Sequence, residues 1–200
     1  MRVSPAAPRR FLASSSALVA ALTLTLGACG GGGGSASPTA GSATLAGTVA
    51  VGAPMVNATI TVKDSKGAAV SAPVGPDGTY SGLSLDGLVG PFALQACGFV
   101  DGNFTCFYAM VGDAGTGNVT PLTNATVALA TGSDPAAFFA SGGASAPTQS
   151  ALDAQEAKLR AALGDLLAKA GLGGSTDFAT TPFTTDRTGM DKLLDAIKVS

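Results

Sequence analysis

The chain has 200 residues and a formal net charge of −2, with no histidine, no tryptophan and only two tyrosines. The lack of histidine excludes the Ser-His-Asp and Cys-His mechanisms of nucleophilic catalysis and removes the commonest transition-metal ligand. The acidic excess argues against a nucleic-acid partner, because phosphate binding needs a clustered basic surface. Hydrophobicity comes mostly from Ala, Val and Leu, so we expect a thin core that depends on a covalent staple.

Residues 1–28 have the pattern of a secretory signal. Three arginines precede an apolar run at residues 17–26, which is short for a membrane span of ~20 apolar residues. Residues 26–29, Leu-Gly-Ala-Cys, resemble the lipobox of bacterial lipoproteins. The resemblance implies cleavage before Cys29, acylation of its sulfur and its freed amine, and attachment to the bilayer. Because Gly30 and not aspartate follows, it also implies the outer membrane.

The glycine-rich stretch after the cysteine differs from the rest of the chain. Residues 29–43 contain little besides Gly, Ser, Ala, Pro and Thr, so we expect a flexible tether. Removal of the first 28 residues leaves 13 acidic and 8 basic residues, a net charge near −5.

Short alternating segments then predict strands. Apolar and polar residues alternate from Thr44 onward, most regularly over residues 56–63, where Val56 belongs to the apolar set. Turn sequences at residues 65–67 and 76–78 separate this strand from another at residues 79–85. Short strands between turn signals indicate an antiparallel β-sandwich, which we place at residues 44–117.

Turn and strand positions of this region form a recognisable pattern: Gly47, Val49, Gly52, Pro54, Asp64, Gly67, Asp77, Gly78 and Tyr80. This pattern resembles the carboxypeptidase-regulatory, or transthyretin-like, sandwich family. The resemblance implies a prealbumin-like fold that acts as a structural or recognition module and is not itself catalytic. The chain departs from the family by continuing into a second hairpin.

The second hairpin can be derived in register. Asp101 and Gly102 form a two-residue turn of type I′, so paired residue numbers sum to 203. Cys97 then faces Cys106 at a non-hydrogen-bonded position with Cα atoms ~4.5 Å apart, which is within the disulfide range of ~4.4–6.8 Å. In an oxidising compartment we expect a disulfide; free thiols and a two-ligand metal site are the alternatives.

The same register separates the two faces of this hairpin. Phe92, Leu94 and Ala96 with their partners form the face that we expect to meet the core. The opposite face carries a strip of Phe99, Phe104 and Tyr108 that is too apolar to stay fully exposed. It is either a binding strip for a glycan, a peptide or another envelope protein, or it is covered by the leucine-rich helix at residues 150–170. We favour the second interpretation because two apolar faces in one small chain usually meet.

Residues 118–200 predict helices. Pro121 and Pro135 are suited to first helical positions, Ser150 and Asp153 suggest a capping box for the helix at residues 150–170, and Gly171 is a stop signal. A last short helix is expected at residues 190–197. Three segments of this region, residues 118–123, 134–139 and 188–195, resemble the helical part of uncharacterised proteobacterial surface lipoproteins. The resemblance implies that the chain is truncated at Ser200.

We therefore expect an α+β chain, with an N-terminal antiparallel β-sandwich followed by a small helical segment. We expect no catalytic residues, no metal and no cofactor; residues 113–118 lack the acidic ladder of a calcium loop and are read as a flexible turn. The function that we expect is a non-enzymatic, lipid-anchored binding or structural module of the outer membrane. The alternatives are an accessory module of an envelope enzyme and an adhesin-like surface protein.

Overall fold

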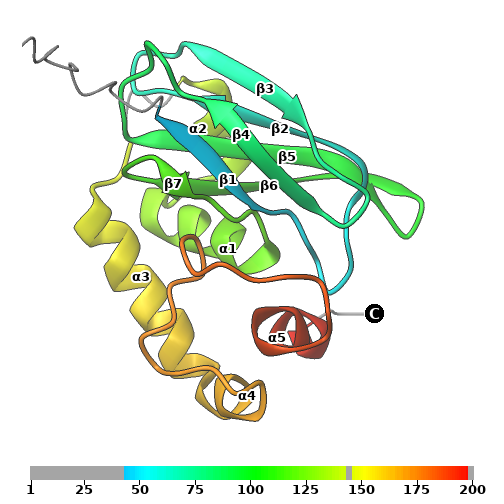
Figure 1. Ribbon diagram of the computed structural model, residues 1–200. Coiled ribbons are helices and arrows are strands. Elements are labelled where there is room, and N and C mark those ends of the chain that lie inside the picture. Colours follow the sequence, from blue (N-terminus) through cyan, green and yellow to red (C-terminus); the bar gives the residue numbers. More distant parts are fainter. Residues whose placement is uncertain (1–42, 143–145, 198–200) are drawn as a thin grey trace, which may run out of the picture. The chain divides into compact units, whose positions relative to one another are not determined.

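The computed structural model describes residues 43–142 and 146–197 of the chain, and Figure 1 shows them with the strands above most of the helices. The predicted signal peptide, the lipidation residue Cys29 and the tether up to residue 42 lie outside the described residues. The described part contains seven strands and five helices. The strands all precede the helices in the sequence, which confirms the predicted α+β class.

The strands form two sheets that pack face to face. One sheet has the order β4-β1-β7 and the other β3-β2-β5-β6, and all pairs are antiparallel except β1 with β7. Side chains from both sheets, including Leu45, Leu83, Ile60 and Leu94, meet in one buried core. The strands are β1 (Thr44–Thr48), β2 (Val56–Lys63), β3 (Ala69–Pro73), β4 (Thr79–Ser84), β5 (Phe92–Val100), β6 (Asn103–Val111) and β7 (Gly115–Thr116).

The β5–β6 hairpin has the register that the two-residue turn predicts. Every pair sums to 203, from Phe92 with Val111 to Val100 with Asn103. The predicted disulfide between Cys97 and Cys106 is present, with a Cα–Cα distance of 4.1 Å. The turn chemistry therefore determines which residues pair along all nine positions of each strand.

Two details of the strands differ from the prediction. A bulge between Val56 and Thr59, with Asn57 at φ 51°, turns Val56 out of the core and pairs it with Phe99. The expected loop at residues 112–117 contains β7, which pairs with β1. The chain crosses so closely here that a Cβ on Gly47 would lie 2.2 Å from the Gly117 oxygen.

The first two helices begin where the prolines predict. Helix α1 (Pro121–Thr131) is capped by Thr120, whose side chain accepts from the Thr123 N–H while the Thr123 hydroxyl accepts in return. Helix α2 (Pro135–Ala140) is capped by the Asp134 carboxylate. Both prolines occupy positions whose N–H would have no intrahelical partner.

The expected single helix at residues 150–170 is two helices, α3 (Gln149–Ala162) and α4 (Gly164–Lys169). The backbone leaves helical geometry at Leu163, next to Gly164. The cap is Thr148, whose hydroxyl accepts from the Ala151 N–H, and not the predicted Ser150. Asp153 instead accepts from the side chain of Gln149, so the predicted capping box is not formed.

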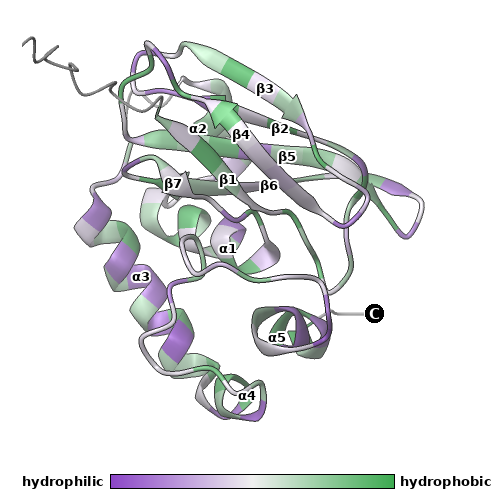
Figure 2. Cartoon of the chain, viewed as in Figure 1, coloured by the Kyte–Doolittle hydropathy of each residue, from purple (hydrophilic) through white to green (hydrophobic). Residues whose placement is uncertain are grey.

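The helices pack in two groups. Helices α1 and α2 contact β6, whereas α4 contacts α5 (Gly189–Ile197). Most leucines of α3 and α4 join Phe178, Leu193 and Leu194 in a cluster away from the sandwich core. Figure 2 shows hydrophilic residues at intervals along α3. None of the described helices is long and apolar enough to cross a membrane.

Candidate functional site

The outer face of the four-stranded sheet, which is turned away from the sandwich core, carries the predicted strip. The register arranges this face of β5 and β6 in four rows from the start of β5 to the turn. The rows are Ala93 with Met110, Gln95 with Tyr108, Cys97 with Cys106, and Phe99 with Phe104.

The two rows farthest from the turn are covered. Tyr108 is buried beside Phe139 of α2, with ring centroids 5.7 Å apart, and its hydroxyl accepts from the Gln95 side chain at 3.1 Å. The Nζ of Lys63 lies 4.5 Å from the centroid of the Phe139 ring and donates to the Phe139 carbonyl oxygen. Helices α1 and α2 therefore form the cover.

The prediction that the leucine-rich helix covers the strip is wrong except at Leu152. Leu152 is the only described leucine of α3 and α4 that joins this buried cluster. The other leucines on both sides of the break at Leu163 pack instead in the cluster that contains residues of α5. The two phenylalanines of α2, which the sequence analysis did not assign to the strip, occupy that space.

The row next to the turn remains exposed. Phe104 is 66% exposed, Phe99 40% and Val56 58%. The two rings meet edge to face with centroids 5.5 Å apart, and Val56 lies directly opposite Phe99 in the ladder. We call Val56, Phe99 and Phe104 the hairpin patch. The structure thus keeps two residues of the predicted strip together at the surface and separates Tyr108 from them.

The hairpin patch has a rigid base. The Cys97–Cys106 disulfide occupies the neighbouring row and joins the two strands. In Figure 1 the turn between β5 and β6 projects beyond the ends of the other strands. An apolar surface on a stapled hairpin loses little conformational entropy on binding, which favours recognition of a partner. The sequence predicted that both phenylalanines belong to the strip, but it did not predict Val56. The bulge that exposes Val56 contains no glycine that would have indicated it.

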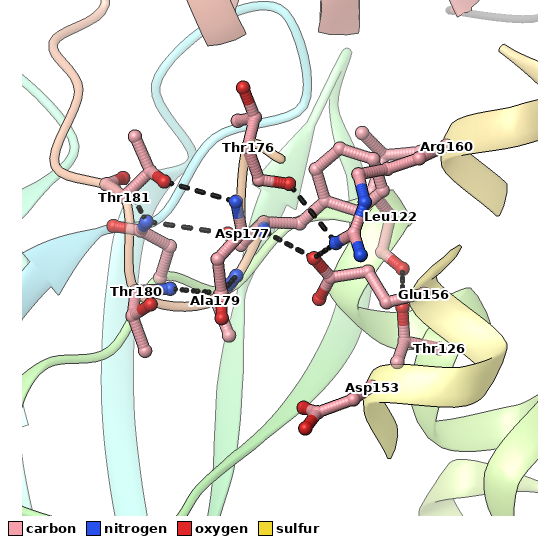
Figure 3. Close-up of polar contacts among 12 residues, drawn as sticks. Leu122, Thr126, Asp153, Glu156, Arg160, Thr176, Asp177, Ala179, Thr180 and Thr181 are labelled. Carbon is pink, nitrogen blue, oxygen red and sulfur yellow. Dashed lines mark hydrogen bonds and ion pairs between the residues drawn. The ribbon is translucent and has the colours of Figure 1, made fainter. Parts of the chain in front are cut away.

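A second polar arrangement involves Glu156 on α3, which the sequence analysis missed (Figure 3). Glu156 is 7% exposed, and its Oε1 accepts from Arg160 and from the backbone N–H of Phe178. Arg160 also donates to the carbonyl oxygen of Thr176 at 3.2 Å. Glu156 and Arg160 therefore hold the irregular segment after α4 against α3. The available signal was the position of Glu156 in the helical stripe of Leu152 and Leu159.

Burial makes the Glu156 carboxyl a weaker acid than an exposed glutamate. Burial, followed by the charge of Asp177, raises the pKa of Glu156 to about 7, although the Phe178 N–H and Arg160 favour ionisation. A cavity of about 20 Å³ adjoins it, lined by Thr126 and other residues of α1, α3 and β6, which is enough for about one water molecule. This space is too small for an organic substrate. The contacts of Glu156 and Arg160 therefore have a structural role, which is to connect α3 to the segment at residues 176–181.

On the other side of the same segment, Asn118 makes a matching set of contacts. Its side chain accepts from the Thr48 N–H and donates to the carbonyl oxygens of Phe178 and Thr181. Asn118 is fully buried. It is the last of the residues that were compared with a calcium loop, and its side chain joins β1 to the segment.

An open groove of about 810 Å³ lies elsewhere in the described part. It lies where Phe92 begins β5 and Gly112 follows β6, so it is at the opposite end of the hairpin from the patch. Its lining is mostly apolar, and no predicted site residue contributes to it.

Neither the described side chains nor the comparisons identify a chemistry. In residues 43–142 and 146–197, no group of three or more Cys, Asp or Glu residues is arranged to hold a metal ion. Comparison with protein-family models, with curated proteins and with solved structures finds no match.

Proposed function

We propose that this chain is a non-enzymatic, lipid-anchored protein of the bacterial envelope whose β-sandwich binds another envelope component through the hairpin patch. The observation that carries the binding role is the row of three exposed apolar side chains at the projecting end of the stapled hairpin. Clustered exposed apolar side chains are characteristic of interaction surfaces. Aromatic side chains in particular are enriched in such interfaces.

The proposed anchor is Cys29. Its support is the lipobox-like stretch at residues 26–29, which follows a charged and then apolar leader. Two or three acyl chains attached at one residue hold a protein stably at a bilayer, whereas a single chain does so only marginally. With Gly30 after the cysteine, the proposed location is the outer membrane.

The proposed fold of the sandwich is prealbumin-like. Its support is the pair of facing sheets, together with the positions of two residues from the family pattern. Gly47 allows the close approach of Gly117, and the Tyr80 hydroxyl donates to the Gly117 carbonyl oxygen at 2.6 Å. In the family that the sequence resembles, such a domain is a recognition or structural module, which agrees with the proposed role.

Replacement of Cys29 tests the anchor. In cells that are labelled with a fatty-acid probe, the wild-type protein should carry the label and sediment with membranes. The Cys29→Ser variant should lose both properties. A double variant, Cys97→Ala with Cys106→Ala, is the matched control and should keep the label. Recovery of Cys29→Ser in membranes at the wild-type level would contradict the anchor.

A photo-reactive residue beside the hairpin patch tests the binding role. Placed at Asn103 in intact cells, it should give a discrete cross-linked species that becomes weaker when Phe104→Ser is added. The same residue at Lys66, which is exposed in the turn at the opposite end of this sheet, should give none. Equal cross-linking from both positions, or a species that is indifferent to Phe104→Ser, would argue against the patch as the binding surface.

A further inference from the structure

The outer edge of β6 carries backbone groups that face no neighbouring strand. Strand β6 is the last strand of its sheet. Val100 and Asn103 form the hydrogen-bonded pair that closes the two-residue turn, so alternate residues of β6 bond to β5. Phe104 and Cys106 are the residues in between. Their N–H and C=O groups therefore point away from the sheet, and no hydrogen bond joins them to another described residue.

Helix α1 closes this edge farther from the turn. The Tyr108 carbonyl oxygen points in the same direction as the groups of Phe104 and Cys106, and it accepts from the Thr123 hydroxyl at 3.0 Å. Thr123 belongs to α1, which packs on β6. The accessible part of the edge is therefore residues 103–107, which is the part that carries Phe104 of the hairpin patch.

The other sheet edges have features that discourage pairing. Strand β3 has five residues and ends at Pro73, and β7 has only two residues. Strand β4 contains Gly82 in a left-handed conformation, with φ 65°. Strand β6 has nine residues and no proline, glycine or charged side chain. Short length, proline and charge are the usual protections of an edge, and β6 has none of them.

We propose that the hairpin patch receives its partner as an extended segment of another protein, added as a strand to the edge of β6 at residues 103–107. This inference rests on the proposed binding role of the patch and specifies how the partner is held. The partner backbone would form up to four hydrogen bonds, to the N–H and C=O groups of Phe104 and Cys106. Such main-chain bonds supply affinity, and contacts to alternate side chains supply selectivity.

The side chains beside the edge determine the chemistry of the partner. On the outer face the added strand would lie next to Phe104, which is 66% exposed and already contacts Phe99. On the other face its neighbours are Thr105 and Phe107, which are partly buried. None of these side chains is charged, so the segment that fits is uncharged, about five residues long, and apolar at the position beside Phe104.

Backbone amide exchange of the full-length protein in detergent micelles tests this inference. The probe is a capped, uncharged pentapeptide that alternates valine and threonine. Without the probe, the Phe104 and Cys106 amides should exchange fast, and the Thr105 and Phe107 amides should exchange slowly. The probe should slow exchange at Phe104 and Cys106 by at least ~10-fold, with no change at Thr105 and Phe107. The same peptide with its alternate amides N-methylated is the matched control and should have no effect.

Three results would overturn strand addition by a partner segment. The first is a change in the ring resonances of Phe99 and Phe104 without a change in exchange at the Phe104 and Cys106 amides. This result would mean that the peptide binds on the face of the sheet, and the proposed function would stand. Protection of both amides on concentration alone would identify a second copy as the occupant. The absence of any change in amide exchange or ring resonances on addition of the peptide would also reject the inference. The cross-linking experiment at Asn103 tests the proposed function separately. In that cross-linking assay, Phe104→Pro should remove more product than Phe104→Ala, because only proline lacks the N–H.

Discussion

The two ends of the β5–β6 hairpin have the same kind of outer face but different surroundings. Away from the turn, Met110 and Tyr108 are buried under α1 and α2. At the turn, Phe99 and Phe104 remain exposed and a disulfide holds the strands together. Helices stabilise one end by packing, whereas a covalent bond stabilises the other and leaves its apolar side chains available. One apolar strip in a single hairpin is therefore buried at one end and exposed at the other, and the exposed end is the surface for which we propose a binding role.

The largest expected difference between the two ends is in the response to removal of an aromatic ring. Phe139→Ala empties the site between Tyr108 and Lys63 and should lower the free energy of unfolding by about 3–5 kcal/mol. Phe104→Ala removes an exposed ring and should change it by at most about 0.5 kcal/mol. Denaturant unfolding of both variants measures the contrast. Similar losses in the two variants would mean that the patch is part of the folded core, and the comparison would fail.

Removal of the disulfide should act on the end at the turn. Cys97→Ala with Cys106→Ala should lower the free energy of unfolding by about 2.5 kcal/mol, the loop-closure value for so short a loop. Amide exchange should increase at Thr105 more than at Ala109, because α1 still covers the far end. Uniform loss of protection along β6 would show that the two ends are not independent.

The stability of the packing between α3 and the segment at residues 176–181 should depend on pH through Glu156. Its pKa is raised in the folded state, from 4.5 to about 7, so the folded protein binds the proton more tightly than the unfolded chain does. The resulting stabilisation is fully present below pH about 4.5, is lost as pH rises through about 7, and amounts to about 2 kcal/mol. Unfolding measured from pH 4 to pH 8 should show this decrease.

Glu156→Gln should flatten that pH dependence, since the amide oxygen can still accept from the Phe178 N–H. Asp165→Asn, an exposed change on α4, is the control and should retain the wild-type slope. Burial also raises the pKa of Asp191 on α5, so the quantity to compare is the difference between the Glu156→Gln variant and the wild type. An unchanged slope in Glu156→Gln would show that this carboxyl does not titrate in the proposed way.

The smallest expected effect concerns the link between α1 and the edge of β6. Thr123→Val removes the hydroxyl that bonds to the Tyr108 oxygen and to the Thr120 N–H, and should lower the free energy of unfolding by about 1 kcal/mol. Thr123→Ser keeps the hydroxyl and should lose less. A larger loss in Thr123→Ser than in Thr123→Val would indicate that the methyl group, and not the hydrogen bonds, stabilises this end.

Local signals in the sequence were sufficient for much of the fold. Asp101 and Gly102 set the hairpin register, and the prolines at 121 and 135 marked the starts of two helices. These features succeed because each depends on residues that are close in sequence. The bulge at Asn57 and the helix break at Leu163 were missed. Leucine at the helix break and asparagine at the bulge are compatible with regular helix and strand, so the residue types at these two positions did not identify the breaks.

The candidate site was predictable only in part. The sequence selected Phe99, Phe104 and Tyr108 as one strip, because they share a face in the derived register. It could not separate them, since exposure depends on where α1 and α2 come to rest. Glu156 was missed because its burial depends on the Phe178 segment, which lies 22 residues further along the chain.

The sequence by itself determined the pairing of Cys97 with Cys106, because a two-residue turn leaves one register for the strands that it joins. Only the tertiary structure decided which apolar side chains of that hairpin are covered. The covering helices are connected to the hairpin by a separate segment, and their position follows from how all the apolar surfaces fit together. A local pattern specifies what a face contains, whereas packing between distant segments specifies what lies against it.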